Sequence, residues 1–588
     1  MIHPTFGTTL GRDGVTFRLW APAAKRVEVL LNTPHDMQRS NDGWFTATVA
    51  SATTGSRYRF RIDGETQVPD PASHYQPDGI FGPSEVIDHD SYRWRATDWR
   101  GRPWDETVVL EAHVGTFTPR GTYRAMIERL DHLAATGMTA LELMPLADFA
   151  GRRNWGYDGV LWYAPAGVYG RPDDLKTLID EAHLRGLMVF LDVVYNHFGP
   201  EGNYLGCYAP AFFSPAATPW GNAIDYRVPE VRQFAIENAL SWLSNYRFDG
   251  LRLDAVHAIV EPGNPPLLSE LSRQVGRFAA ATRRTIHLIL ENDDNRATLL
   301  DPRAEPPAGR YRAQWNDDYH HAWHVMLTGE TAGYYQDYAD PRRAIARALG
   351  SGFVYQGENS KHRSGARRGE PTQDLPPTAF VSFLQNHDQI GNRAFGDRLE
   401  TLADPAAMEA ALAITLLAPM PPMLFMGEEW ASRAPFPFFC DFAGDLAEAV
   451  RQGRRREFRA AYAAYGDEIP DPLSEATFDS ARLDWHELAS PAGRERLSLV
   501  RRLLTIRKAC ILPHLAAARF DDAYISAAGL LSARWRLRKS GSLALLANLS
   551  EAAIPLPDDS VSSGDVIWGH RVSDTMTPWA VVWTAGGG

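Results

Sequence analysis

The chain has 588 residues, of which 44% are hydrophobic and 22% are charged, as in an ordinary globular protein with a large core. Its formal net charge of -12 at pH 7 disfavours nucleic acid and anionic membranes as partners. At about 100–200 residues per domain, this length predicts about three or four domains.

The first residues and the cysteines favour a cytoplasmic protein. MIHPTFGTTL has neither the positive region nor the apolar region of a secretory signal, and no stretch reaches the roughly 18 apolar residues of a membrane span. Cys207, Cys440 and Cys510 lie far apart and lack metal-ligand spacing. Such sparse cysteines are typical of reduced thiols, so we expect a cytoplasmic location without membrane or nucleic-acid partners.

The amino-terminal part is predicted to be all β. Its apolar or alternating runs are short and are separated by Gly, Asn and Pro, which is typical of strands and turns. The runs are VTFRLWAP, RVEVLLN, WFTATVA and YRFRID. We predict a β-sandwich module over residues 1–95.

From Thr107 onward the pattern changes to strands that alternate with helices. Helical segments are expected over residues 123–137, 172–186, 231–246 and 267–282, with glycines or prolines at several of their ends. Eight strand candidates occur, as a closed (β/α)₈ TIM barrel of the α/β class requires. They are TVVLEAHV, ALELMPL, LMVFLDVVYNH, FDGLRLDAVH, IHLILEND, RYRAQWN, AFVSFLQNHD and MPPMLFMGEEW.

The last part of the chain is predicted to be helical and then β. Residues 445–510 have a helical pattern, and the basic run Arg454-Arg455-Arg456 within them is interpreted as a solvated helix face. LLSARWRLR, SLALLANLS and AVVWTA then predict a small β domain. The expected domains are therefore 1–95, a catalytic barrel with a helical extension over 96–510, and a carboxy-terminal β domain over 511–588.

Polar clusters directly follow four of the predicted strands. Taken singly, such an Asp is typical of a helix N-cap and such a His of a core side chain. Together they deliver carboxylates from separate strands to one rim of the barrel, where catalysis takes place in this fold. The clusters are Asp192 with Asn196 and His197, Arg252 with Asp254 and His257, Glu291 alone, and His387 with Asp388.

This concentration of negative charge indicates a reaction. Burying it costs several kcal/mol unless it is compensated or used. Arg252 lies on the same strand face as Asp254, because strand side chains alternate, and it can hold Asp254 ionised. One ionised carboxylate and one with a raised pKa are what cleavage of a glycosidic bond needs.

DVVYNH, GLRLDAVH, LILEN and FLQNHD resemble the four ordered signature regions of the α-amylase superfamily (glycoside hydrolase family thirteen). This resemblance implies a retaining reaction with Asp254 as nucleophile, Glu291 as general acid/base and Asp388 as transition-state stabiliser. It also implies a sugar subsite with a stacking tyrosine in NWGYD, lined by Tyr157, Asp192, His197, Arg252 and His387.

Within the superfamily, longer segments resemble the hydrolases that cleave the α-1,4 bond next to the terminal trehalose of maltooligosyltrehalose. The segments are LILENDDN, QWNDDYHHAWHVMLTGE, FVYQGENS, FLQNHDQIGNRAFGDRL and MGEEWASRAPFPFF. The resemblance implies release of trehalose and a maltooligosaccharide, with maltooligosyltrehalose synthase as pathway partner. It also likens residues 1–95 to a glycogen-binding-type module.

The trehalose end of the substrate is expected to bind at residues 314–324 and 428–439, with Asp317 and Trp430 as contacts. His257, where many α-amylases carry Lys, is a further expected sugar contact. Many α-amylases bind calcium partly through the asparagine that corresponds to Asn196. No acidic loop completes such a site here, so we predict no required metal and no cofactor.

Two alternatives remain. A branching or debranching enzyme that acts on α-1,6 linkages would share the barrel and the same three acids, and only its products would distinguish it. A catalytically silent glucan-binding barrel would need none of these acids, yet Asp254, Glu291 and Asp388 are all present.

Overall fold

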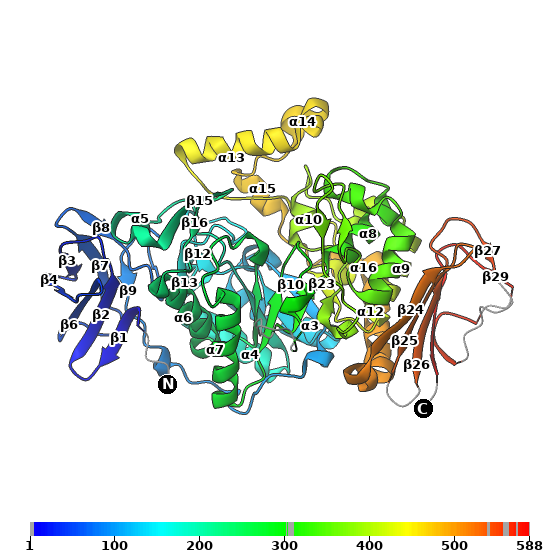
Figure 1. Ribbon diagram of the computed structural model, residues 1–588, viewed down its shortest axis with the longest axis horizontal. Helices are drawn as coiled ribbons and strands as arrows, with labels where there is room; N and C mark the ends of the chain where they lie inside the picture. Colours follow the sequence, from blue (N-terminus) through cyan, green and yellow to red (C-terminus); the bar gives the residue numbers. More distant parts are fainter. Residues whose placement is uncertain are drawn as a thin grey trace.

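The computed structural model describes residues 5–301, 303, 311–537, 541–556, 564–571 and 574–586. The molecule is elongated, with an amino-terminal β part at one end, a barrel in the middle and a carboxy-terminal sheet at the other end (Figure 1). In the described part of the chain, no helix is both long enough and apolar enough to cross a membrane.

The amino-terminal part is a β-sandwich, as predicted. Alternate residues of β2 (Gly14–Trp20) and β7 (Arg57–Ile62) are buried, because strand side chains point to opposite faces in turn. The two sheets pack through these faces, and the rings of Phe17 and Tyr58 are 4.8 Å apart. The sheet orders are β1 (Gly7–Gly11), β2, β6 (Trp44–Val49), β5 (Gln38–Arg39), and β4 (Pro34–Asp36), β3 (Val27–Leu30), β7, β8 (Thr66–Val68).

The eight predicted barrel strands are confirmed. They form one parallel sheet, which closes where the Met423 N–H donates to the Ser382 carbonyl at 2.9 Å. In chain order the strands are β10 (Val109–Ala112), β11 (Ala140–Leu143), β14 (Met188–Val193), β17 (Gly250–Leu253), β18 (His287–Leu290), β19 (Ala313–Trp315), β22 (Phe380–Val381) and β23 (Met423–Phe425).

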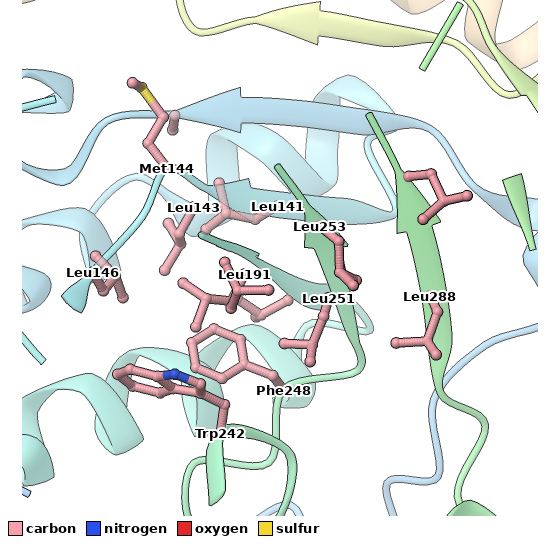
Figure 2. Close-up of a cluster of buried hydrophobic side chains, with 14 of the residues drawn as sticks. Leu141, Leu143, Met144, Leu146, Leu191, Trp242, Phe248, Leu251, Leu253 and Leu288 are labelled. Carbon is pink, nitrogen blue, oxygen red and sulfur yellow. The ribbon is translucent and has the colours of Figure 1, made fainter. Parts of the chain in front are cut away.

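Side chains along each barrel strand point alternately outward, toward the surrounding helices, and inward, into the centre of the barrel. Figure 2 shows leucines of β11, β14 and β17 that point outward and lie near Trp242 of α6 (Pro229–Asn245). Inside the barrel, Phe190 and Ile289 belong to a separate apolar cluster. Glu111 of β10 and Arg252 of β17 also point inward but lie nearer the carboxyl ends of their strands. Polar groups therefore collect at that end of the barrel.

Helices link the strands close to the positions predicted for them. α4 (Pro172–Leu184), α6 and α7 (Leu267–Thr282) lie close to the predicted ranges, and α8 (Asp317–Thr328) and α12 (Pro405–Leu417) link further strands. The helix predicted over 123–137 is instead divided into α2 (Tyr123–Ile127) and α3 (Leu130–Thr136). At the division the Arg129 guanidinium lies 4.3 Å from the centre of the Trp485 ring, a long-range contact that sequence periodicity does not reveal.

Two helices lie above the carboxyl end of the barrel, and a β domain follows them. The helices are α13 (Gly444–Glu457) and α14 (Arg459–Tyr465) (Figure 1). The β domain was predicted from the sequence, and it packs against α9 (Pro341–Ser351). The packing is close at Gly350, because an added Cβ there would lie 2.8 Å from the Cβ of Ala523. Its described sheet has the order β24 (Arg519–Ile525), β25 (Leu531–Arg536), β26 (Ser542–Ala547), β30 (Val581–Gly586), β28 (Asp565–Trp568).

Candidate active site

A cavity of about 530 Å³ lies at the carboxyl ends of the barrel strands, and Asp254, Glu291 and Asp388 all line it. Asp254 follows β17 and Glu291 follows β18, while Asp388 belongs to α10 (His387–Gly391), after β22. Parallel strands of a closed barrel all end at the same rim, so residues far apart in the chain meet there.

Two donors hold the carboxylate of Asp254. Nη1 of Arg252 donates to Oδ1 at 2.7 Å, and Nδ2 of Asn196 donates to Oδ2 at 3.0 Å. Donors aimed at a carboxylate stabilise its charged form, and the bond from Arg252 is charge-assisted. Asp254 can therefore present a carboxylate to a substrate in the cavity.

Arg252 connects several acids of the site. It is buried, and its Cζ lies 4.1 Å from the centre of the Trp315 ring. Its Nη1 also donates to Oδ2 of Asp192 at 2.7 Å, while its Nη2 lies 3.9 Å from Oε2 of Glu291. The guanidinium thus compensates part of the negative charge that the strands bring together.

Glu291 has the environment of a proton donor. Its Oε2 accepts the backbone N–H of Ala255 at 2.6 Å, and Ala255 has a φ of 39°, in the left-handed region. Burial raises the pKa of Glu291, Asp254 adds to the effect, and Arg252 opposes it. A protonated carboxyl beside a carboxylate is the pair that glycosidic cleavage requires.

Asp388 lies beside His387, which Glu111 holds in place. The His387 N–H and ring Nδ1 both contact Glu111 of β10, at 3.1 and 2.5 Å. Burial alone would lower the pKa of His387, but Glu111 and Asp388 bring it above its ordinary value. Burial raises the pKa of Asp388, His387 opposes this shift, and Asp254 adds to it. A histidine held in its charged form can orient a sugar hydroxyl and balance Asp388.

Two aromatic layers line the cavity. The Tyr157 ring stacks on His387, with centroids 5.0 Å apart and planes at 24°, and its hydroxyl donates to Oδ2 of Asp192 at 2.6 Å. Nε2 of His197 donates to the Tyr157 carbonyl at 3.0 Å, and the His197 ring stacks on Trp220, with centroids 4.6 Å apart. Flat rings at such a position suit the apolar faces of sugars.

Tyr157→Ala is expected to raise KM about ten- to hundredfold, because it removes a ring worth roughly 1.5–3 kcal/mol of buried apolar contact. Tyr157→Phe keeps the ring and removes only the hydrogen bond to Asp192, so a smaller rise in KM is expected. Steady-state kinetics and thermal melting of both variants check this. Unchanged kinetics with a large fall in melting temperature would mean that Tyr157 only packs between loops.

Of three other predicted sugar contacts, two line the cavity and the third, Asp192, does not. His257 and Asp317 line the cavity, and Nδ1 of His257 accepts the Asp293 N–H at 3.2 Å. Burial, with Glu291 and Asp293 nearby, raises the pKa of Asp317 well above its ordinary value. Asp192 lies behind the cavity wall, where burial raises its pKa to about 7 although Arg252 opposes the shift.

Among the described residues, no three His, Cys, Asp or Glu side chains come close enough together to hold a metal ion.

Three known protein families match parts of the chain. The alpha amylase catalytic domain matches residues 77–207, and carbohydrate-binding module 48, the isoamylase N-terminal domain, matches residues 5–78. A domain family of unknown function matches residues 518–583.

Whole-chain comparisons are more specific. The chain is 41% identical to a malto-oligosyltrehalose trehalohydrolase of Deinococcus radiodurans, over 85% of this chain and 82% of that one. It is also 41% identical to one of Saccharolobus solfataricus, over 86% and 87%. A solved Salmonella typhimurium protein, provisionally described as an alpha amylase, is 43% identical, with a TM-score of 0.93 over 100% of both chains. The chain belongs to the malto-oligosyltrehalose trehalohydrolase family.

The structure corrects the expectation for Trp430 in this trehalohydrolase family member. Trp430, in η9 (Glu428–Trp430), is only 1% exposed and does not line the cavity. Its ring packs against Trp485, with centroids 4.6 Å apart, and against His132. Of the aromatic run that follows, Phe438 lines the cavity, whereas Phe436 is fully buried. Residues 428–439, which were predicted to form a wall of the trehalose site, therefore belong mainly to the core.

Several cavity residues were missed from the sequence. They come from segments beyond the strand ends, such as η7 (Gly333–Tyr338) and the β20–β21 hairpin (Glu358–Asn359 with Arg367–Arg368). The long stretch between β19 and β22 was the available signal, since extended loops at this barrel face carry function. The missed residues include Trp155, Trp220, Tyr334, Asp337, His362, Arg363, Arg368 and Arg454.

The basic run of α13 is also corrected. Arg455 and Arg456 are exposed, in agreement with a solvated helix face. The Arg454 side chain is only 12% exposed, and it lines the cavity. The interpretation is therefore wrong for Arg454, because the helix places this side chain over the barrel.

Proposed function

We propose that the chain is a retaining glycoside hydrolase that cleaves the α-1,4-glucosidic bond next to the terminal trehalose of maltooligosyltrehalose. The observation that carries this is the group of Asp254, Glu291 and Asp388 around one cavity, with Arg252 between the first two. The relatives named malto-oligosyltrehalose trehalohydrolase, which match most of the chain, support the substrate.

In the first step, a carboxylate oxygen of Asp254 bonds to the anomeric carbon while the bond to the leaving oxygen breaks. The proton of Glu291 passes to that oxygen, so trehalose leaves as a neutral alcohol. Asp388 stabilises the positive charge that develops on the sugar ring. In the second step, Glu291 takes a proton from water, the resulting oxygen nucleophile attacks the same carbon, and Asp254 is released with net retention.

The leaving trehalose would occupy the side of the cavity formed beyond β19. Asp317, His321 and Tyr334 line this side, together with His362 and Arg363 of the β20–β21 hairpin. These groups offer donors and acceptors to the many hydroxyls of a disaccharide. Polar groups that would be left unpaired with the wrong ligand give the sharpest discrimination, which favours this wall as the specificity site.

The substrate class also sets the expected partner and compartment. A maltooligosaccharide with a terminal trehalose must be made by an isomerising enzyme, so maltooligosyltrehalose synthase is the proposed pathway partner. The three cysteines form no disulfide, which agrees with the reducing cytoplasm that we propose.

In a competition assay with equal concentrations of maltotriosyltrehalose and maltopentaose, trehalose is expected to be the main product, with much slower cleavage of maltopentaose. Chromatography of the products against time measures both rates. Products with new α-1,6 linkages would indicate a branching enzyme, and no cleavage of either substrate, since neither has an α-1,6 linkage, would be the result for a debranching enzyme. Equal rates on both substrates, or no trehalose, would leave only a general α-glucan hydrolase.

A further inference from the structure

The helices α13 and α14 form an arm, residues 444–465, above the barrel (Figure 1). In this arm only Arg454 lines the cavity, among the residues that the structure describes. Its Cζ lies 4.4 Å from the centre of the Phe438 ring and 5.3 Å from that of Phe458. Its Nη1 also contacts the Glu457 carboxylate at 2.9 Å. These contacts hold the guanidinium in one place at the cavity edge.

The guanidinium is the first member of a hydrogen-bond chain that ends on Asp388. Nη1 of Arg454 donates to Oδ1 of Asn392 at 3.0 Å, and Nδ2 of Asn392 donates to Oδ1 of Asp388 at 2.7 Å. A guanidinium only donates and a carboxylate only accepts, so a single orientation of the Asn392 amide satisfies both contacts. Arg454 therefore keeps the amide NH₂ group directed at Asp388.

The backbone next to Asn392 is also restrained. Nη2 of Arg454 donates to the Gly391 carbonyl at 3.3 Å. A Cβ on Gly391 would lie 1.9 Å from Cζ2 of Trp155, so the backbone packs directly on that ring and only glycine fits. The end of α10 is thus attached to the arm through Arg454 and to the cavity wall through Trp155.

We propose that Arg454 is a positioning residue that orients Asp388 through Asn392, so that the arm sets the geometry of the transition-state stabiliser. The inference rests on the proposed role of Asp388, but it does not depend on which leaving group is released. The charge on Asp388 matters mostly in the transition state, so a displaced Asp388 lowers kcat more than it weakens binding.

The charges around Asp388 support this arrangement. Burial raises the pKa of Asp388, and His387 opposes that shift. Asp254 raises the pKa further, whereas Arg252 and Arg454 lower it. Arg454 therefore favours the ionised form of Asp388 in addition to fixing its orientation.

Arg454→Ala is expected to lower kcat about 10- to 100-fold, while KM changes by no more than about threefold. Arg455→Ala is the matched control, because this neighbouring arginine of α13 is exposed and lies over Tyr462, away from the cavity. The control is expected to keep the kcat of the unsubstituted protein. An unchanged kcat in Arg454→Ala, or a rise in KM alone, would overturn the proposal.

Asn392→Asp tests orientation without loss of stability. Its carboxylate can pair with Arg454, so the melting temperature should be maintained, but it presents negative charge to Asp388 in place of an NH₂ donor. We expect kcat to fall at least as far as in Arg454→Ala. A nearly unchanged kcat in the Asn392→Asp variant would show that the amide does not orient Asp388.

Arg454→Ala combined with Asn392→Ala completes a double-mutant cycle. If both residues act through one chain, the double variant should be about as slow as the slower single variant. Fully additive losses would mean independent effects and would overturn the proposal.

Each rate is measured on maltotriosyltrehalose and on maltopentaose. The two substrates distinguish failure of the proposed role of Arg454 from failure of the proposed function. If the unsubstituted protein releases no trehalose, the proposed substrate is wrong, but the effect of Arg454 can still be measured on maltopentaose.

Discussion

Asp254→Ala is expected to lower kcat by on the order of 10⁴-fold or more, because it removes the atom that bonds to the anomeric carbon. The fold should survive, since Arg252 keeps its contact with Asp192 and the site loses one of several crowded negative charges. We expect the melting temperature to stay within about 3 °C. Trehalose release from maltotriosyltrehalose and calorimetric melting measure the two effects.

Asp131→Ala is a suitable control for this variant. Asp131 is also a carboxylate paired with an arginine, Arg185 at 2.7 Å, but it is exposed and does not line the cavity. Its kcat should be unchanged. If Asp254→Ala retained activity within about tenfold of the control, Asp254 could not be the nucleophile.

Glu291→Gln is expected to lower kcat on maltotriosyltrehalose by about 10²- to 10⁴-fold, the usual contribution of a general acid. The loss should be much smaller for the first step with a maltotriosyl fluoride, because fluoride leaves with less help from a proton. Comparison of fluoride release with trehalose release measures the difference. An equal loss on both substrates would assign Glu291 a role other than acid catalysis.

The pH dependence gives a second test of Glu291. Burial raises its pKa, Arg252 opposes the shift and Asp254 adds to it, so the protonated form persists to higher pH than in an ordinary glutamic acid. Activity should therefore fall as pH rises through this raised pKa. Glu291→Gln cannot lose that proton, so its profile should lack the decline on the basic side. A profile unchanged in shape would contradict the assignment.

The barrel could be predicted from the sequence because each of its strands is a local pattern. Apolar runs of strand length, ended by polar residues, mark the eight strands without reference to distant residues. The alternation that places Arg252 and Asp254 on one face is equally local. In the structure the Arg252 guanidinium does contact Asp254, at 2.7 Å.

Residues beyond the strand ends could not be predicted in this way. Trp430 and Phe438 both follow β23 and are both large aromatic residues, yet one is buried against Trp485 and the other lines the cavity. Which of two similar rings faces the cavity depends on the path of an irregular loop, and no residue period describes that path.

The sequence by itself determined the eight strand segments of the barrel, the acids at its rim and the resemblance to a glycosidase superfamily, because these depend on local periodicity and short motifs. Only the tertiary structure decided that Trp430 belongs to the core and that Arg454 reaches the cavity. In α13, three adjacent arginines are chemically equivalent in sequence. Helical geometry turns them about 100° apart, and packing of the helix over the barrel selects the one that approaches Asn392.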